Sequence, residues 1–376
     1  MTAQGYQICI RCIMDNASDP DIHFDANGVC NNCAAYDRSA GSYLRTDGQD
    51  KGELNRVLEK IKKDGRGKRY DCVVGISGGI DSTYVVYMAK KLGLRPLAVH
   101  FDNGWNYEIS VRNIKRVCEK LNVDLYTYVH DWDEFRDIQL AFLRASVVDI
   151  EMITDHAILG TLYRAASREG VRYIISGANV ATEAGQSIAS WVFDKKDLTH
   201  IKYLHRRFGT GKMRTFPGFG FWRAMYYWGI KRIRSVSLLN YLPYSKDEAM
   251  ATLQTELGFE DYGGKHHEST WTRIYQTYIL PRKFGFDKRR AHLSSLINSG
   301  QMTRKQALEE IKKPPCSEEL LKADIDLVLS KFGLTEQEWD AIMKAPVKKH
   351  TDYKVGHAWR LVRRLYRLLT VRKGTE

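Results

Sequence analysis

A run of small residues between a strand-like and a helix-like stretch is the part of the sequence best suited to chemistry. It follows the apolar residues 72–76 and comprises Ser77, Gly78, Gly79, Ile80, Asp81 and Ser82. Adjacent glycines allow a tight turn in which backbone N–H groups approach an anion, and the following helix presents its positive end to the same place. The loop therefore predicts a binding site for the phosphates of a nucleotide.

This loop differs from a Walker A loop in its charge. It lacks the Gly-Lys-Ser/Thr ending, and Asp81 stands where the lysine would be. Without that lysine, the loop is suited to hold a pyrophosphate through N–H and hydroxyl groups, with a metal on the carboxylate. We expect ATP and Mg²⁺ as cofactors, Asp81 as both metal ligand and catalytic residue, and Ser77, Gly78, Gly79 and Ser82 as further ATP-binding residues.

Four of the seven cysteines form two Cys-x-x-Cys pairs, Cys9 with Cys12 and Cys30 with Cys33, separated by 17 residues. This spacing is typical of a zinc ribbon, in which each pair places two thiolates on one Zn²⁺. Four cysteine ligands leave no open position, so the predicted metal is structural. Two disulfides or four unrelated thiols are the alternative, which a reducing compartment disfavours.

The elements that must position the loop alternate between strand and helix. We expect strands at 70–76, 95–101, 125–129 and 173–176, and helices at 83–92, 108–121, 133–148 and 154–169. Such alternation predicts an α/β fold with a parallel, Rossmann-like sheet. The predicted domains are a zinc ribbon at 1–50, a nucleotide domain at 51–195, and a mainly helical, basic region for substrate or partner binding at 196–376.

Polar residues follow two of these strands, where nucleotides bind in such sheets. Asp102 and Asn103 end the second strand, and Gly177 and Asn179 follow the fourth. We expect all four to contact ATP. Glu183 is a candidate second metal ligand or base, with an exposed carboxylate at a helix start as the alternative.

The composition limits the classes of protein. The chain has 376 residues, 43% of them hydrophobic, and a formal net charge of +13. These values predict a folded, multidomain protein, and no apolar run approaches the ~20 residues that span a bilayer, so we expect a cytoplasmic location. The charge permits nucleic acid, anionic lipid or a phosphorylated small molecule as a partner.

A basic amphipathic helix at 357–373 predicts either docking onto the protein itself or a partner subunit, or peripheral contact with an anionic membrane.

Several sequence blocks extend the phosphate loop into a family pattern. With the loop and the four cysteines, the blocks 262–268, 280–285, 287–295 and 299–304 resemble the N-acetyl sugar amidotransferases, the WbpG-type lipopolysaccharide biosynthesis enzymes. This family belongs to the PP-loop ATP pyrophosphatases, so the resemblance implies an adenine nucleotide alpha hydrolase-like fold. It also implies an amidotransferase, or amidine synthase, that forms a C–N bond in O-antigen biosynthesis.

The resemblance implies a substrate as well as a reaction. The acetamido group of a UDP-linked N-acetyl sugar, 2,3-diacetamido-2,3-dideoxy-mannuronate in the WbpG type, would become acetamidino through an adenylylated imidate, with release of AMP and pyrophosphate. His266, His267 and Glu268 are then candidates for orienting the substrate or transferring a proton. Lys283, Arg289 and Arg304 would meet its carboxylate or diphosphate.

The source of ammonia must lie outside this chain, because the sequence has no Gly-x-Cys-x-Gly elbow of a glutaminase. The resemblance implies a HisH-like glutaminase and a HisF-like subunit that guides ammonia between sites.

Two other functions fit part of the sequence. A tRNA-thiolating PP-loop enzyme also combines zinc knuckles with an ATP pyrophosphatase core, but it would need sulfur-carrying cysteines near the nucleotide, and Cys72 and Cys118 lie inside a predicted strand and helix. A non-enzymatic zinc-ribbon protein that binds nucleic acid would explain the charge but not the complete phosphate loop.

Overall fold

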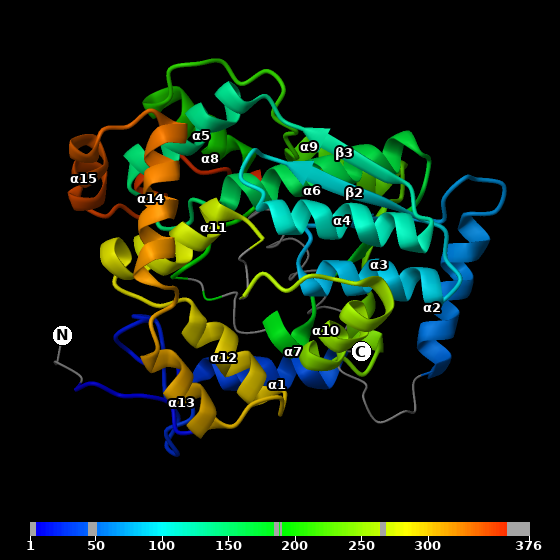
Figure 1. Ribbon diagram of the computed structural model, residues 1–376, viewed down its shortest axis with the longest axis horizontal. Coiled ribbons are helices and arrows are strands. Elements are labelled where there is room, and N and C mark those ends of the chain that lie inside the picture. The colour runs from blue at the N-terminus through cyan, green and yellow to red at the C-terminus, as the bar shows by residue number, and fades with distance from the viewer. Residues whose placement is uncertain (1–4, 44–50, 184–187, 189, 264–267, 359–376) are drawn as a thin grey trace, which may run out of the picture.

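The computed structural model describes residues 5–43, 51–183, 188, 190–263 and 268–358, and a five-stranded parallel sheet forms its centre (Figure 1). The strand order is β3-β2-β1-β4-β5, and every neighbouring pair is parallel. The strands are β1 (Cys72–Gly75), β2 (Pro96–Asp102), β3 (Leu125–Val129), β4 (Tyr173–Ser176) and β5 (Arg234–Ser237). The predicted α/β fold with a parallel sheet is therefore confirmed.

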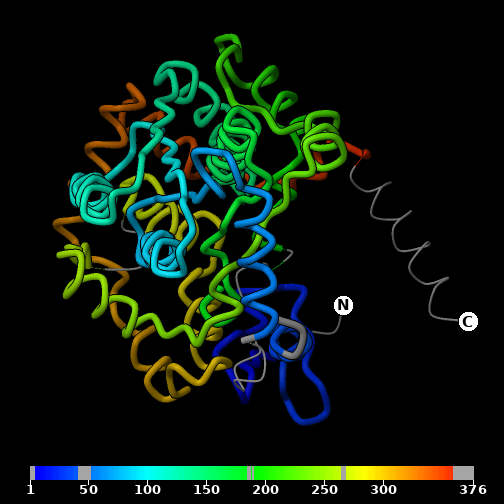
Figure 2. Tube along the Cα trace, turned by 90° about the vertical axis from the view of Figure 1, so that its right-hand side faces the viewer, coloured from blue at the N-terminus to red at the C-terminus, as the bar shows by residue number. Residues whose placement is uncertain are grey.

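Helices cover both faces of the sheet, as a parallel sheet with apolar strands requires. On one face, α3 (Ile80–Lys91) and α4 (Glu108–Leu121) pack with Val74 and Ala98. On the other, α6 (Met152–Arg168) packs with Val73 and Leu97. Because successive side chains of a strand point to opposite faces, neighbouring strand residues enter separate apolar clusters. Figure 2 shows the sheet between these two sets of helices.

The sheet extends beyond the nucleotide domain predicted at 51–195. Strand β5 pairs with β4, with Tyr173 opposite Arg234, and α10 (Lys246–Leu257) packs against α3. The sequence prediction missed β5 because three of its four residues, Arg-Ser-Val-Ser, are polar and two of the four are exposed. The boundary predicted at residue 195 thus falls inside the part of the chain that builds the sheet.

Outside the sheet and the helices already described, the chain is mainly helical, and this includes the region from residue 196 onward for which it was predicted. Its π-helices are η2 (Tyr226–Ile230) and η4 (Tyr275–Phe284), and its 3₁₀ helices are η3 (Leu238–Tyr241) and η5 (His350–Asp352). Its α-helices, besides α10, are α5 (Trp132–Ala145), α7 (Val180–Glu183), α8 (Leu198–Phe208), α9 (Phe221–Met225), α11 (Thr270–Ile274), α12 (Arg289–Asn298), α13 (Arg304–Lys312), α14 (Glu318–Phe332) and α15 (Glu336–Lys344).

The cysteine-bearing N-terminal segment packs against this helical region instead of standing alone. Helix α1 (Asn31–Tyr43) contacts α7 and α12, and α2 (Lys51–Asp64) then leads into β1. Ile13 is fully buried in a small cluster with Leu293 of α12 and Ala307 of α13. Figure 1 shows α1, α12 and α13 together at the end of the molecule below the sheet.

Two features of the sequence bear on membranes. Among the described residues, no helix has the length and apolar character that crossing a membrane requires. The basic helix predicted at 357–373 lies almost wholly outside the described residues, which end at 358.

Helix α6 depends on one glycine for its position. A Cβ on Gly160 would lie 1.7 Å from the carbonyl oxygen of Pro217. We therefore expect Gly160→Ala to destabilise the fold by roughly 2 kcal/mol or more through overpacking. Thermal or urea unfolding would measure this loss. Gly229→Ala is the matched control, because its Cβ would meet nothing within 4 Å, and an equal effect of both variants would contradict the expectation.

Candidate active site

The loop between β1 and α3 has the geometry of an anion cradle. Gly78 adopts φ +83°, in the left-handed region that favours glycine, and a Cβ there would lie 2.7 Å from the carbonyl oxygen of Ser110. The Ser77 hydroxyl accepts a hydrogen bond from the N–H of Gly79 (3.2 Å), and the Ser82 hydroxyl accepts one from the N–H of Ser77 (3.1 Å). The N-cap residue of α3 is Gly79, which has no side chain to cap the helix, and the hydroxyl of Tyr262 accepts a hydrogen bond from the N–H of Ile80 in the first turn.

A cavity of about 550 Å³ lies at this loop, at the carboxyl ends of β1, β2 and β4. Most residues predicted to bind ATP or act in catalysis line it. These are Ser77, Gly79, Asp81, Ser82, Asn103, Gly177, Glu183 and Glu268. The structure therefore brings residues from four separate parts of the chain to one place.

Three residues predicted to contact ATP do not line the cavity, and the structure gives them supporting contacts. The Cα of Gly78 packs closely against Ser110, where a side chain would not fit. The Asp102 carboxylate accepts hydrogen bonds from the Gly104 N–H and from the side chain of Asn106, each at 2.9 Å, and Asn106 itself lines the cavity. Asn179 accepts a hydrogen bond from the N–H of Thr182 at the start of α7. Contact of Asp102 and Asn179 with the nucleotide stays a prediction, and in the structure both support neighbouring cavity segments.

Two tyrosines pack against the acids at the loop. The hydroxyl of Tyr244 donates to Asp81, and burial together with this carboxylate and that of Glu183 raises the pKa of Tyr244. Burial, followed by the charge of Glu268, raises the pKa of Tyr262. Both phenols therefore stay protonated at neutral pH. Asp81 is a suitable ligand for Mg²⁺, which combines one or two carboxylates with phosphate oxygens and water.

Glu268 reaches the loop because its segment pairs with the segment that follows β2. The Tyr107 N–H donates to the Glu268 carbonyl (2.9 Å), and the Thr270 N–H donates to the Trp105 carbonyl (3.0 Å). We call residues 268–270 the strap. A Cβ on Gly79 would lie 3.4 Å from Oε1 of Glu268, so this carboxylate sits beside the loop. The predicted residues His266 and His267 lie outside the described residues.

The three cations predicted to bind substrate make contacts within the protein, and their role in substrate binding stays a prediction. Lys283 donates to the carbonyl of Ala345 (3.0 Å), and Arg289 pairs with Asp287 (2.7 Å). Arg304 donates to the carbonyl of Cys12 (3.0 Å). None of the three lines the cavity.

Four charged residues and one glutamine that the sequence analysis did not assign to the site also line the cavity. Lys246 starts α10 near the loop, while Glu151, Asp155, Gln276 and Lys288 line another part. Burial lowers the pKa of Lys288, and the nearby cation of Lys195 lowers it further. Lys288 lies within the block 287–295, so the sequence pattern indicated the region but not which of its cations lines the cavity.

The cavity has an apolar end and a polar end on α6. Apolar or small residues, including Gly75, Val99 and Leu162, line the first, which suits an adenine ring. Glu151, just before α6, and Asp155 in its first turn line the second. At 1.5 Å per residue, Leu162 lies about 10 Å along the helix from Asp155. One cavity can thus take a nucleotide and a polar acceptor side by side.

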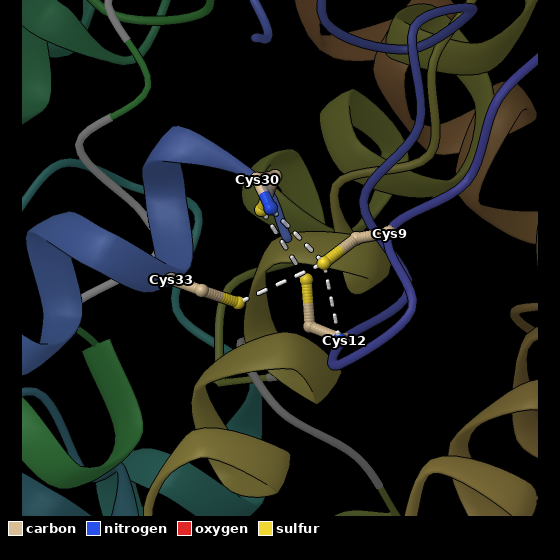
Figure 3. A group of neighbouring side chains, drawn as sticks. All are labelled: Cys9, Cys12, Cys30 and Cys33. Atoms are coloured by element: carbon tan, nitrogen blue, oxygen red, sulfur yellow. Dashed lines mark hydrogen bonds between the residues drawn. The ribbon is translucent and has the colours of Figure 1, made fainter. Parts of the chain in front are cut away.

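The four predicted metal ligands come together as a separate cluster (Figure 3). Their sulfur atoms all lie within 4.8 Å of one another, with Cys9 and Cys33 at 3.9 Å and Cys12 and Cys30 at 3.7 Å. Sulfur atoms around a tetrahedral Zn²⁺ lie about 3.8 Å apart, whereas a disulfide is about 2.05 Å long. The donor set therefore fits a metal ion in a closed site and excludes the disulfide alternative.

Arginine side chains and backbone N–H groups support this cluster. Cys9 Sγ accepts hydrogen bonds from the N–H groups of Cys12 (3.4 Å) and Cys30 (3.3 Å), which stabilise a thiolate. The Arg304 guanidinium holds the carbonyls of the first cysteine pair. The cluster thus connects the N-terminal segment to α13.

Two family comparisons match separate parts of the chain. Residues 268–366 match the family described as LPS biosynthesis protein WbpG-like, C-terminal domain, and residues 71–159 match the family described as queuosine biosynthesis protein QueC. Residues 71–159, which contain the phosphate loop, are thus similar to a family of PP-loop ATP pyrophosphatases, and the C-terminal segment is similar to WbpG-like proteins.

Individual relatives are more distant. An uncharacterized protein from Methanocaldococcus jannaschii is 23% identical over 83% of this chain and 95% of its own length. The 7-cyano-7-deazaguanine synthase of Sulfurimonas denitrificans is 36% identical, but over 23% of this chain and 37% of its own length.

Similar solved structures include the NH3-dependent NAD synthetase of Campylobacter jejuni, with 14% identity, 78% of this chain and 96% of that chain covered, and a TM-score of 0.30. They also include a U34-tRNA thiolase from Methanococcus maripaludis, with 16% identity, 70% and 82% coverage, and a TM-score of 0.34. At these TM-scores the likeness carries no argument about function.

The cysteine cluster gives a direct test. We expect Cys12→Ser to lose bound metal and to unfold at a lower temperature, because three thiolates no longer close the site. Elemental analysis of the purified protein and a thermal melt with and without chelator would measure both effects. Cys316→Ser is the control, since Cys316 lies outside the cluster, and equal metal content in the two variants would contradict the assignment.

Proposed function

We propose that this enzyme converts the acetamido group of a UDP-linked N-acetyl sugar into an acetamidino group, using ATP and ammonia. The observation that carries the proposal is the shared cavity. The WbpG-like segment contributes Glu268, Thr272, Gln276 and Lys288 to the same cavity that the PP-loop lines from the other side. A nucleotide on the loop would therefore place its α-phosphate near an acceptor held by this segment.

The chemistry explains why an ATP pyrophosphatase loop would be needed. An acetamide carbonyl is a poor electrophile, so ammonia does not displace its oxygen unaided. Attack of the amide oxygen on the α-phosphorus, with loss of the amide N–H proton to water, forms a neutral O-adenylyl imidate and breaks the bond to pyrophosphate. Ammonia then adds to the imidate carbon, and the C–O bond to AMP breaks. The products are the amidine, AMP and pyrophosphate.

The loop would act on the leaving pyrophosphate. Its N–H groups and the hydroxyls of Ser77 and Ser82 stabilise charge that develops as the phosphorus–oxygen bond breaks. Asp81 is the residue we assign to hold Mg²⁺, which neutralises phosphate charge when bound. In this scheme Zn²⁺ is the ion of the cysteine cluster, where it has a structural role.

The acceptor end would favour an anionic sugar. Lys288 and Lys246 are cationic residues of the cavity wall, and they take over the role that the sequence suggested for Lys283, Arg289 and Arg304. A UDP-linked 2,3-diacetamido-2,3-dideoxy-mannuronate has both a diphosphate and a carboxylate to meet these cations. We place the reaction in the synthesis of a lipopolysaccharide O-antigen, with a HisH-like glutaminase and a HisF-like subunit as the source of ammonia.

A tRNA-thiolating function has less support. No cysteine is among the residues that line the cavity. Cys72 and Cys118 are buried, and burial raises the pKa of the Cys118 thiol to about 11, so neither is suited to carry sulfur to the nucleotide.

The substrate proposal is tested with the purified full chain. Incubated with ATP, Mg²⁺, ammonium and UDP-2,3-diacetamido sugars, it should form AMP and a sugar whose mass falls by the difference between oxygen and NH. Mass spectrometry would identify the product. Formation of ADP, or of AMP without any change in the sugars, would refute the proposal.

The role of Asp81 is tested in the same assay. We expect Asp81→Asn to lower AMP formation by roughly 100-fold or more, because phosphate charge is no longer neutralised through the metal. Asp340→Asn is the control, since Asp340 is an exposed residue of α15 that pairs with Lys344. Near-normal turnover of Asp81→Asn would remove this residue from the mechanism.

A further inference from the structure

Glu151 is a buried carboxylate with one oxygen unused. It precedes α6 and lines the polar end of the cavity. Its Oε2 accepts a hydrogen bond from the hydroxyl of Thr272 (2.8 Å), whereas its Oε1 has no partner among the described residues. The hydroxyl of Thr154, which lines the same cavity, also lacks a partner there. Buried acceptors of this kind indicate a ligand that donates hydrogen bonds.

The charges around Glu151 leave room for one more cation. The carboxylates of Asp149, Glu151 and Asp155 all act on the buried Tyr275, so they lie close together. Lys195 pairs with Asp149 (2.7 Å) and Asp155 (3.0 Å). Lys288 is the second cation that acts on Glu151. When Glu151 is ionised, three carboxylates face two lysines, and a bound ammonium ion balances the charge.

The protonation of Glu151 suits a proton acceptor. Burial raises its pKa to about 7, with a further rise from Asp155, while the Thr272 hydroxyl and the cations of Lys288 and Lys195 oppose the shift. A carboxyl group that titrates near the working pH can both take and release a proton.

We propose that the polar end of the cavity is an ammonium site, in which Oε1 of Glu151 binds the incoming ion and accepts its proton. The proposal rests on the function proposed above. It gives Glu151 the proton transfer that the sequence suggested for His266, His267 and Glu268.

The step balances without a further reactant. Glu151 takes one proton from NH₄⁺, which leaves NH₃ and the neutral carboxylic acid. The nitrogen lone pair forms the C–N bond to the neutral imidate, the C–O bond to AMP breaks, and the three ammonia hydrogens remain on the amidinium product. The proton on Glu151 then passes to water.

Kinetics with Glu151→Gln test the proton transfer. We expect kcat/KM for ammonium at neutral pH to fall roughly 100-fold or more, while sugar-dependent exchange of pyrophosphate into ATP persists. Hydroxylamine, which is already uncharged at neutral pH, should restore C–N bond formation in the variant. Glu336→Gln is the control, because Glu336 is exposed on α15.

The pH profile separates this role from a structural one. Activity of the wild type requires ionised Glu151, so kcat/KM should rise with pH and level off above about 7. Glu151→Gln can use only free ammonia, so its kcat/KM should continue to rise at higher pH. The gap between the two proteins therefore narrows as the pH increases. Parallel profiles would overturn the proposal.

Binding of a monovalent cation tests the proposed ammonium site independently of the reaction. Thallium(I) resembles ammonium in charge and size and scatters X-rays anomalously. Crystals of the wild type soaked in a thallium(I) salt should show an anomalous peak beside Glu151, and crystals of Glu151→Gln should not. Absence of the peak in the wild type overturns the ammonium site. A wild type that shows the peak but converts no acetamido sugar would instead refute the proposed function and leave the cation site standing.

Discussion

Two backbone hydrogen bonds between the strap and residues 105–107 hold the site together. They lay the start of the WbpG-like segment across the loop that follows β2, so that one cavity receives side chains from both. Because backbone groups make these bonds, the arrangement does not depend on which side chains the strap carries. The phosphate loop can therefore keep its structure while the side chains at 272, 276 and 288 change to suit a different acceptor.

Local patterns in the sequence predicted the parts whose geometry is local. The Ser77–Ser82 loop and the two cysteine pairs act within a few residues of themselves, and their spacing predicted their structures. The cations of the WbpG-like segment behave differently, because helix packing decides which of Arg289 and its neighbour Lys288 faces the cavity. Glu151 gave no sequence signal at all, since its burial depends on Thr272 and Lys288 from distant segments. Strand β5 was missed for a similar reason, because its pairing with β4, which lies some 60 residues earlier in the chain, places its short and mostly polar segment in the sheet.

The metal cluster and the cavity are mechanically connected. Arg304 and Arg290 bind backbone and side-chain groups of the first cysteine segment from α13 and α12. Lys288, immediately before α12, reaches the cavity from the same stretch of chain. A metal ion held by the four cysteines would therefore help to fix the position of Lys288, which it does not touch.

The contact between Arg304 and Cys12 joins residues 292 positions apart in the chain. During synthesis the cysteine pairs leave the ribosome early, yet their anchor on α13 is made only near the end. The strap likewise pairs with residues 105–107 of the loop that follows β2 only after some 160 further residues have been synthesised. The hydrogen bond between Ser110 and Glu268, 158 positions apart, shows this separation. Such long-range closure is slow compared with local folding. The phosphate loop is thus translated long before residues 268–288, so the growing chain lacks a complete cavity until this later segment has folded.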